Sequence, residues 1–102
     1  MLLIARGEGQ DIVTCNEGCQ PTTTTEGAST DVFVAGYGVH RKGDLNTIHT
    51  FAPPVCPSHQ TPLTSSSSTV FVNGKGVGRQ TDKYLVELIT SVTQTSVFTG
   101  SM

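Results

Sequence analysis

The chain contains no tryptophan and few other aromatic residues, and only 35% of its 102 residues are hydrophobic. This composition does not favour packed helices, whereas the many Thr, Ser and Gly residues favour short strands and turns. A chain of this length forms one domain, here residues 1–102, near the lower size at which a hydrophobic core suffices for stability. We therefore expect a small, mainly β protein that gains from an additional cross-link.

Positive charge is scarce as well. Six Lys and Arg residues stand against eight Asp and Glu residues, which gives a formal net charge of -2. Proteins that bind nucleic acid through its phosphates need a basic surface. The sequence therefore argues against a nucleic-acid partner.

Long apolar runs are missing too. No segment approaches the roughly 20 apolar residues of a membrane-spanning helix. At the N-terminus, four apolar residues after the Met precede Arg6, too few for the core of a signal peptide. We expect a protein that stays in the cytoplasm unless a machine exports it.

Cysteine is present in an odd number, namely Cys15, Cys19 and Cys56. An odd count argues against a complete disulfide framework and favours metal ligation as the cross-link. A disulfide between Cys15 and Cys19 stays open as an alternative.

An internal repeat organises the chain. The segment "STDVFVAGYGVHRKGD" (29–44) aligns without gaps with "SSTVFVNGKGVGRQTD" (67–82) at an offset of 38, and nine of sixteen positions are identical. Each copy is typical of a β-hairpin: an apolar strand, a turn at 35–36 or 73–74, and a returning strand that ends in Arg and Asp. Two whole repeats are therefore expected to form two hairpins.

The two ends of the chain supply the halves of a third unit. "IARGE" (4–8) resembles a returning strand, and "TSVFTG" (95–100) resembles an outgoing strand. All three arginines fall at the returning position, and three of four phenylalanines fall at the outgoing position: Arg6, Arg41 and Arg79; Phe33, Phe71 and Phe98. We expect three hairpin units related by approximate three-fold symmetry, with neighbouring termini.

The segments around the hairpins carry further expectations. The arginines are expected to form structural ion pairs with Asp44, Asp82 and Glu8, tying one hairpin to the next. "TTTT" (22–25) and "SSSS" (65–68) are interpreted as polar strand positions, with a disordered linker as the alternative. Residues 83–94 are expected to form a short helical or strand turn.

A group of metal-ligand side chains lies in one loop, "HTFAPPVCPSHQ" (49–60). Cys56 and His59 have the spacing of two zinc ligands from one turn, and His49 lies in the same loop. The fourth ligand is His40 on the strand that feeds this loop, or Cys15 or Cys19 in the equivalent loop after Arg6. The sequence therefore predicts a structural zinc site.

Catalytic motifs are lacking. The sequence has no His-Glu-x-x-His and no Gly-x-Ser-x-Gly, and the loop has no acidic residue after Asp44 to serve as a general base. "GKGVG" (74–78) lacks the Lys-Ser/Thr ending of a phosphate-binding loop and is interpreted as a hairpin turn. We expect a protein that is not an enzyme. A zinc-stabilised interaction module of another kind and a small zinc hydrolase are the alternatives.

The quoted motifs, most specifically those in 29–82, resemble the PAAR-repeat proteins along nearly the whole chain. The resemblance implies a small cone of three pseudo-three-fold hairpin units with a metal site near its tip. The family's ligands are three His and one Cys, which correspond here to His40, His49, Cys56 and His59. The implied cofactor is one zinc ion, with iron as the alternative.

The resemblance also implies a function. PAAR-repeat proteins cap the trimeric β-helical spike of contractile injection machines, one monomer per trimer, and help the spike to pierce the target cell envelope, with transient contact with the target membrane. The machine is a phage baseplate, which places the protein in the virion, or a type VI secretion system, which exports it. The absence of a fused toxin domain favours the phage baseplate.

Overall fold

The computed structural model describes residues 2–15, 21–50, 58–85 and 87–99. Within these ranges the chain forms eleven short strands and no helix, so the expectation of a mainly β protein is confirmed. No helix that is long and apolar enough to cross a membrane occurs in the described ranges.

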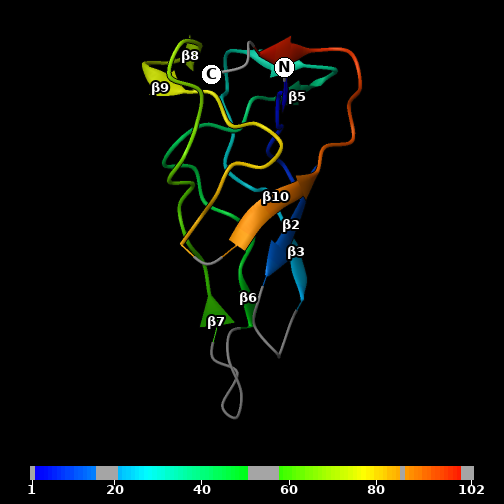
Figure 1. Cartoon of the computed structure of the whole chain (residues 1–102), viewed down its shortest axis with the longest axis vertical. Helices are drawn as coiled ribbons and strands as arrows, with labels where there is room; N and C mark the ends of the chain where they lie inside the picture. The colour runs from blue at the N-terminus through cyan, green and yellow to red at the C-terminus, as the bar shows by residue number, and fades with distance from the viewer. Residues whose placement is uncertain (1, 16–20, 51–57, 86, 100–102) are drawn as a thin grey trace.

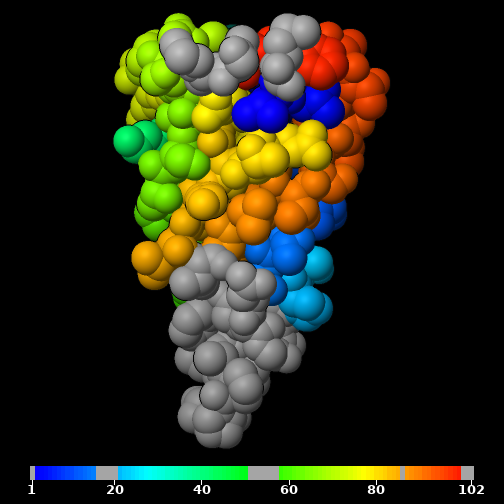
Figure 2. Space-filling model, in the orientation of Figure 1, coloured from blue at the N-terminus to red at the C-terminus, as the bar shows by residue number. Residues whose placement is uncertain are grey.

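Three antiparallel strand pairs share one register. β4 (Phe33–Val34) pairs with β5 (Tyr37–Gly38), and β8 (Phe71–Val72) pairs with β9 (Lys75–Gly76). β1 (Leu2–Leu3) pairs with β11 (Phe98–Thr99), so the two ends of the chain do lie together. In each pair the repeat-equivalent phenylalanine opposes the second residue of the returning strand. The three pairs lie at one end of the molecule, where Figure 2 shows the first and last described residues side by side (Figures 1 and 2).

The two hairpin turns have left-handed backbone conformations. Ala35 and Gly36 have φ values of 49° and 88°, and Asn73 and Gly74 have φ values of 54° and 77°. Positive φ at both central residues belongs to the turn type that matches the twist of two-residue hairpins. The predicted turns at 35–36 and 73–74 are therefore confirmed.

The returning strands of the three pairs join in a closed cycle. Isolated antiparallel bridges link Arg6 to Val39, Arg41 to Val77, and Ile4 to Arg79. Buried apolar side chains from the returning segments and from β4 form one hydrophobic cluster, with two partly buried valines packed against it: Ile4, Val34, Val39 and Val77; Val70 and Val72.

A larger sheet lies beyond this end. β10 (Glu87–Ser91), β2 (Ile12–Cys15) and β3 (Thr22–Thr24) form an antiparallel sheet in that order. Farther along the molecule, β6 (His49–Thr50) pairs with β7 (Ser58–His59) (Figure 1). Residues 83–94 thus contribute a five-residue strand. The Thr run supplies β3, whereas Ser65–Ser68 lies outside any strand, so the interpretation of the Ser run was wrong.

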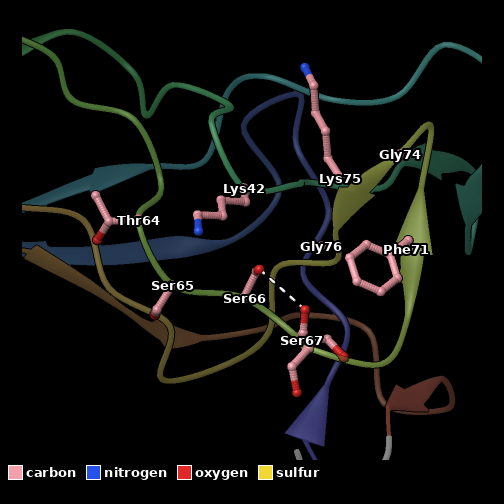
Figure 3. A pocket seen from close by; sticks show the side chains of 10 residues that line it. Lys42, Thr64, Ser65, Ser66, Ser67, Phe71, Gly74, Lys75 and Gly76 are labelled. Carbon is pink, nitrogen blue, oxygen red and sulfur yellow. Dashed lines mark hydrogen bonds between the residues drawn. The ribbon is translucent and has the colours of Figure 1, made fainter.

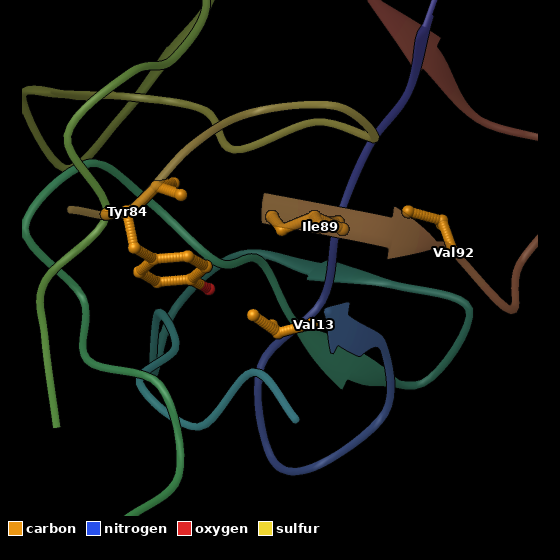
Figure 4. Close-up of a cluster of buried hydrophobic side chains, with 6 residues drawn as sticks. Val13, Tyr84, Ile89 and Val92 are labelled. Carbon is orange, nitrogen blue, oxygen red and sulfur yellow. The ribbon is translucent and has the colours of Figure 1, made fainter. Parts of the chain in front are cut away.

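A second hydrophobic cluster packs β2 and β10 against apolar side chains from outside this sheet. Figure 4 shows Val13, Ile89 and Val92 with the ring of Tyr84 in this cluster. Leu63 and Ala5 complete it. Because β2 and β10 both contribute apolar side chains, the cluster fixes the position of the strand ends that carry Cys15 and Glu87.

The arginines form two of the three expected ion pairs. Arg41 Nε lies 2.9 Å from Asp44 Oδ2, and Arg79 Nε lies 3.0 Å from Asp82 Oδ2, which raises the pKa of Arg79. Both pairs are local, and Arg41 also donates from Nη1 to Asn73 Oδ1 at 2.9 Å in the next hairpin turn.

Arg6 differs from the other two arginines. Its guanidinium donates to Ala35 O and Thr93 Oγ1, at 3.0 and 2.6 Å. Glu8 instead accepts from Gly38 N at 2.8 Å, so the expected pair between Arg6 and Glu8 was wrong. The shared feature is that Arg6 and Arg41 each reach the turn of the following hairpin.

Candidate metal centre

Two cross-strand pairs form the candidate site. His49 lies opposite His59 in the β6–β7 pair, and Cys15 lies opposite Glu87 in the β2–β10 pair. Directly opposed residues in antiparallel strands have Cβ atoms only about 5 Å apart, with side chains on the same face. Strand register therefore brings four metal-ligand side chains together from four separate strands.

Cys15, His49 and Glu87 converge in the interior, and His59 reaches the same Glu87 carboxylate. His49 Nε2 lies 2.8 Å from Glu87 Oε2, and His59 Nε2 lies 2.9 Å from the same oxygen. One ligand atom each of Cys15, His49 and Glu87 lies within 4.8 Å of the others. The side chains of His49 and Glu87 have no exposed surface, and that of His59 is 14% exposed.

The hydrogen bonds define the direction of the His49 ring. Nδ1 lies 2.8 Å from Thr47 O, and because a carbonyl oxygen only accepts, Nδ1 carries the hydrogen. In neutral His49, the lone pair of Nε2 therefore faces a carboxylate oxygen. Two acceptors at this separation are compatible only with a shared proton or a cation.

A second set of buried residues holds Glu87. Thr61 Oγ1 donates to Glu87 Oε1 at 2.9 Å, and Asn46 Nδ2 donates to Thr61 Oγ1 at 3.0 Å. Asn46 Oδ1 accepts from Thr61 N at 3.0 Å. Metal ligands are commonly oriented in this way, with a ligand imidazole donating its other N–H and a ligand carboxylate accepting a further bond. The buried group of Cys15, His49 and Glu87 can thus hold a metal ion.

The charges of the donor set suit a divalent cation. If Cys15 binds the ion as a thiolate, it and the Glu87 carboxylate supply two negative charges, and a divalent cation with two neutral imidazoles makes the group neutral. Sulfur and nitrogen donors suit zinc or iron better than magnesium or calcium.

His40 lies in a different environment. Its Nδ1 donates to Gly27 O at 2.6 Å, and its Nε2 accepts from the Tyr84 hydroxyl at 2.7 Å. Burial lowers the pKa of His40 below 6.5, and burial likewise raises that of Tyr84, so the ring is neutral and the phenol protonated. The structure does not bring His40 together with His49 and His59, and its role as fourth ligand stays a prediction.

The other sequence candidates divide into two groups. Cys56 and Cys19 lie outside the described residues, so their roles and a Cys15–Cys19 disulfide also stay predictions. Cys15, named as an alternate ligand, lies beside His49. Sequence reasoning missed Glu87, whose only signal was an acidic residue within the apolar pattern of 84–92.

The cluster contains two His, one Cys and one Glu, whereas the PAAR-repeat resemblance implies three His and one Cys. The carboxylate comes from β10, far along the chain from the His/Cys loop. No protein-family model matches the chain, and a search of curated proteins finds no significant match.

Proposed function

We propose that this protein is the metal-stabilised tip of a trimeric β-helical spike in a contractile injection machine, with a phage baseplate favoured over a type VI secretion system. It caps the spike, one monomer per trimer, and helps it to pierce the target envelope. The proposed architecture is a cone whose base is the three strand pairs and whose metal site lies near its tip.

The observation that carries this proposal is the shared register of the three strand pairs. One chain meets a three-fold partner evenly only if it presents three near-equivalent units. Support comes from the matched pairing of β1–β11, β4–β5 and β8–β9 and from the cyclic bridges between their returning strands. Exposed strand edges at this end are suited to add to the strands of a partner.

The metal has a mechanical role in this proposal. We propose one zinc ion held by Cys15, His49, His59 and Glu87, which come from β2, β6, β7 and β10. When bound, the ion would join the segments that follow all three returning strands. A closed structural site adds its binding free energy to folding and stiffens a chain with a small core.

Burial favours a structural role over a hydrolytic one. A general base must reach a substrate or a water beside it, whereas the Glu87 side chain is fully buried and its two oxygens contact His49, His59 and Thr61. An interaction module of another kind would also use a buried metal. Such a module has no need for three strand pairs in one register.

The experiment is native mass spectrometry of this protein mixed with the trimeric spike protein encoded beside it. We expect one copy per trimer. Val32→Asp, at an exposed apolar position beside β4, should weaken the complex, whereas Ile12→Asp on the three-stranded sheet should not. Three copies per trimer, or no complex with the neighbouring spike protein, contradicts the proposal.

A further inference from the structure

A polar groove lies beside β8 and β9, away from the metal centre. It has a volume of about 570 Å³, within the range of small-molecule sites. Its lining combines hydroxyl groups, two lysines, the hairpin glycines and one aromatic ring: Thr64, Ser65, Ser66, Ser67, Ser68; Lys42, Lys75; Gly74, Gly76; Phe71. Among the described residues no carboxylate side chain lines it, and the nearest acidic contact is Asp82 Oδ1, which accepts from Ser65 Oγ at 3.0 Å.

Two lysines give this groove a positive charge, although the chain as a whole has a net charge of -2. The arginines donate to protein acceptors, whereas neither Lys42 nor Lys75 forms an ion pair within the described ranges. The third lysine is close by, since Lys83 N donates to Ser65 Oγ at 2.8 Å. In the view of Figure 3, Lys42 and Lys75 lie above the serine segment, the Lys75 ammonium group points away from it, and the Phe71 ring lies at one end.

The repeat provides an internal comparison. An equivalent groove of about 350 Å³ lies beside β4 and is lined by Ser29, Thr30 and Phe33, the counterparts of Ser67, Ser68 and Phe71. There Glu26 takes the place of Thr64, and Glu8 also lines the groove. The same backbone framework thus carries two negative side chains in one unit and two positive ones in the other.

We propose that the groove beside β8 and β9 binds a phosphorylated saccharide. Lysine ammonium groups bind phosphate as point charges, and an exposed aromatic ring offers an apolar face to a sugar ring. Ser65 Oγ donates to Asp82 Oδ1 and Ser67 is buried, so the exposed hydroxyls of Thr64 and Ser68 are the ones that would exchange hydrogen bonds with sugar hydroxyls. Phe71 is 59% exposed and points away from the inward-facing cluster that contains Val72. This proposal concerns the free protein, because β8 and β9 also belong to the base that the spike-tip proposal places against the spike.

The test is an NMR titration of the isolated protein with glucose 6-phosphate. We expect amide shifts at Ser65–Ser68 and Gly74–Gly76, and none at Ser29 or Thr30. Lys42→Gln with Lys75→Gln should weaken binding about tenfold or more, because two charge-assisted contacts are lost. Lys83→Gln changes the net charge in the same direction outside the lining residues and should have little effect.

Two further probes separate the parts of the proposal. Inorganic phosphate should bind more weakly than glucose 6-phosphate, and Phe71→Ala should remove that difference whereas Phe33→Ala should not. Equal binding of both probes to the unmodified protein overturns the saccharide assignment. Equal shifts in both grooves, no shifts at all, or binding of an acidic peptide in preference to glucose 6-phosphate overturns the site.

Discussion

A metal-ligating residue could be predicted from the sequence where it belongs to a local motif. His49 and His59 share one loop, and the structure brings them together across β6 and β7. Glu87 was not predictable, because it reaches the site through the β2–β10 register with Cys15, which a local spacing does not encode. His40 has an imidazole that can bind a metal, but in the structure its two ring nitrogens bond to Gly27 O and to the Tyr84 hydroxyl.

At Thr61, removing one hydroxyl tests the support of the metal site. Thr61→Val keeps the side-chain shape and removes the donor to Glu87 Oε1. We expect zinc affinity to fall about 10- to 100-fold, as is usual when a group that orients a ligand is lost. Competition with a chromogenic chelator measures this. Thr64→Val, whose hydroxyl donates to Lys83 O, is the matched control, and equal loss in both variants would mean that Thr61 has no special role.

The pKa of His40 predicts a pH dependence. The unfolded chain binds a proton at His40 near pH 6.5, whereas the folded chain resists protonation to a lower pH. Stability from this residue is therefore complete above pH 6.5 and decreases as the pH falls towards the folded pKa. Urea unfolding at pH 7.5 and 5.5 should show a smaller pH effect in His40→Gln than in the unmodified protein. An NMR midpoint for the His40 ring at or above 6.5 contradicts this.

At the scale of elements, the hairpins were the most predictable part. Glycine turns, alternating apolar residues and the repeat locate β4, β5, β8 and β9 in sequence, and the pairing is local. The sheet β10-β2-β3 was less predictable, because β10 and β2 are far apart in the chain. The serine segment resembled a strand in composition, yet it lines a groove instead.

The turn at Ala35 offers a stabilising substitution. Ala35 has a φ of 49°, a left-handed conformation that costs most residues with a Cβ about 1 kcal/mol. Asn tolerates it better, and Asn73 occupies the equivalent turn with a φ of 54°. Ala35→Asn should raise the melting temperature by a few degrees. Asn73→Ala should lower it, and a decrease in both variants contradicts the strain argument.

At the scale of the whole molecule, two connections join parts of the chain that are far apart in sequence. The β1–β11 pair joins its two ends, and the proposed metal joins β2, β6, β7 and β10. Structural zinc contributes about 10–16 kcal/mol in small metal modules, which is comparable to the entire stability of an ordinary domain. Metal binding and folding are therefore expected to be coupled. The repeat made the first connection predictable, whereas the second depends on strand register.

The most direct test is the zinc content of the purified protein, measured by elemental analysis together with its melting temperature before and after chelation. We predict one zinc ion per chain and a large decrease in melting temperature on chelation. Cys15→Ser and Glu87→Gln should lose the zinc, whereas Glu26→Gln, an acidic residue outside the centre, should retain it. A chain without zinc, or zinc retained at full stoichiometry in both Cys15→Ser and Glu87→Gln, contradicts the proposed metal centre.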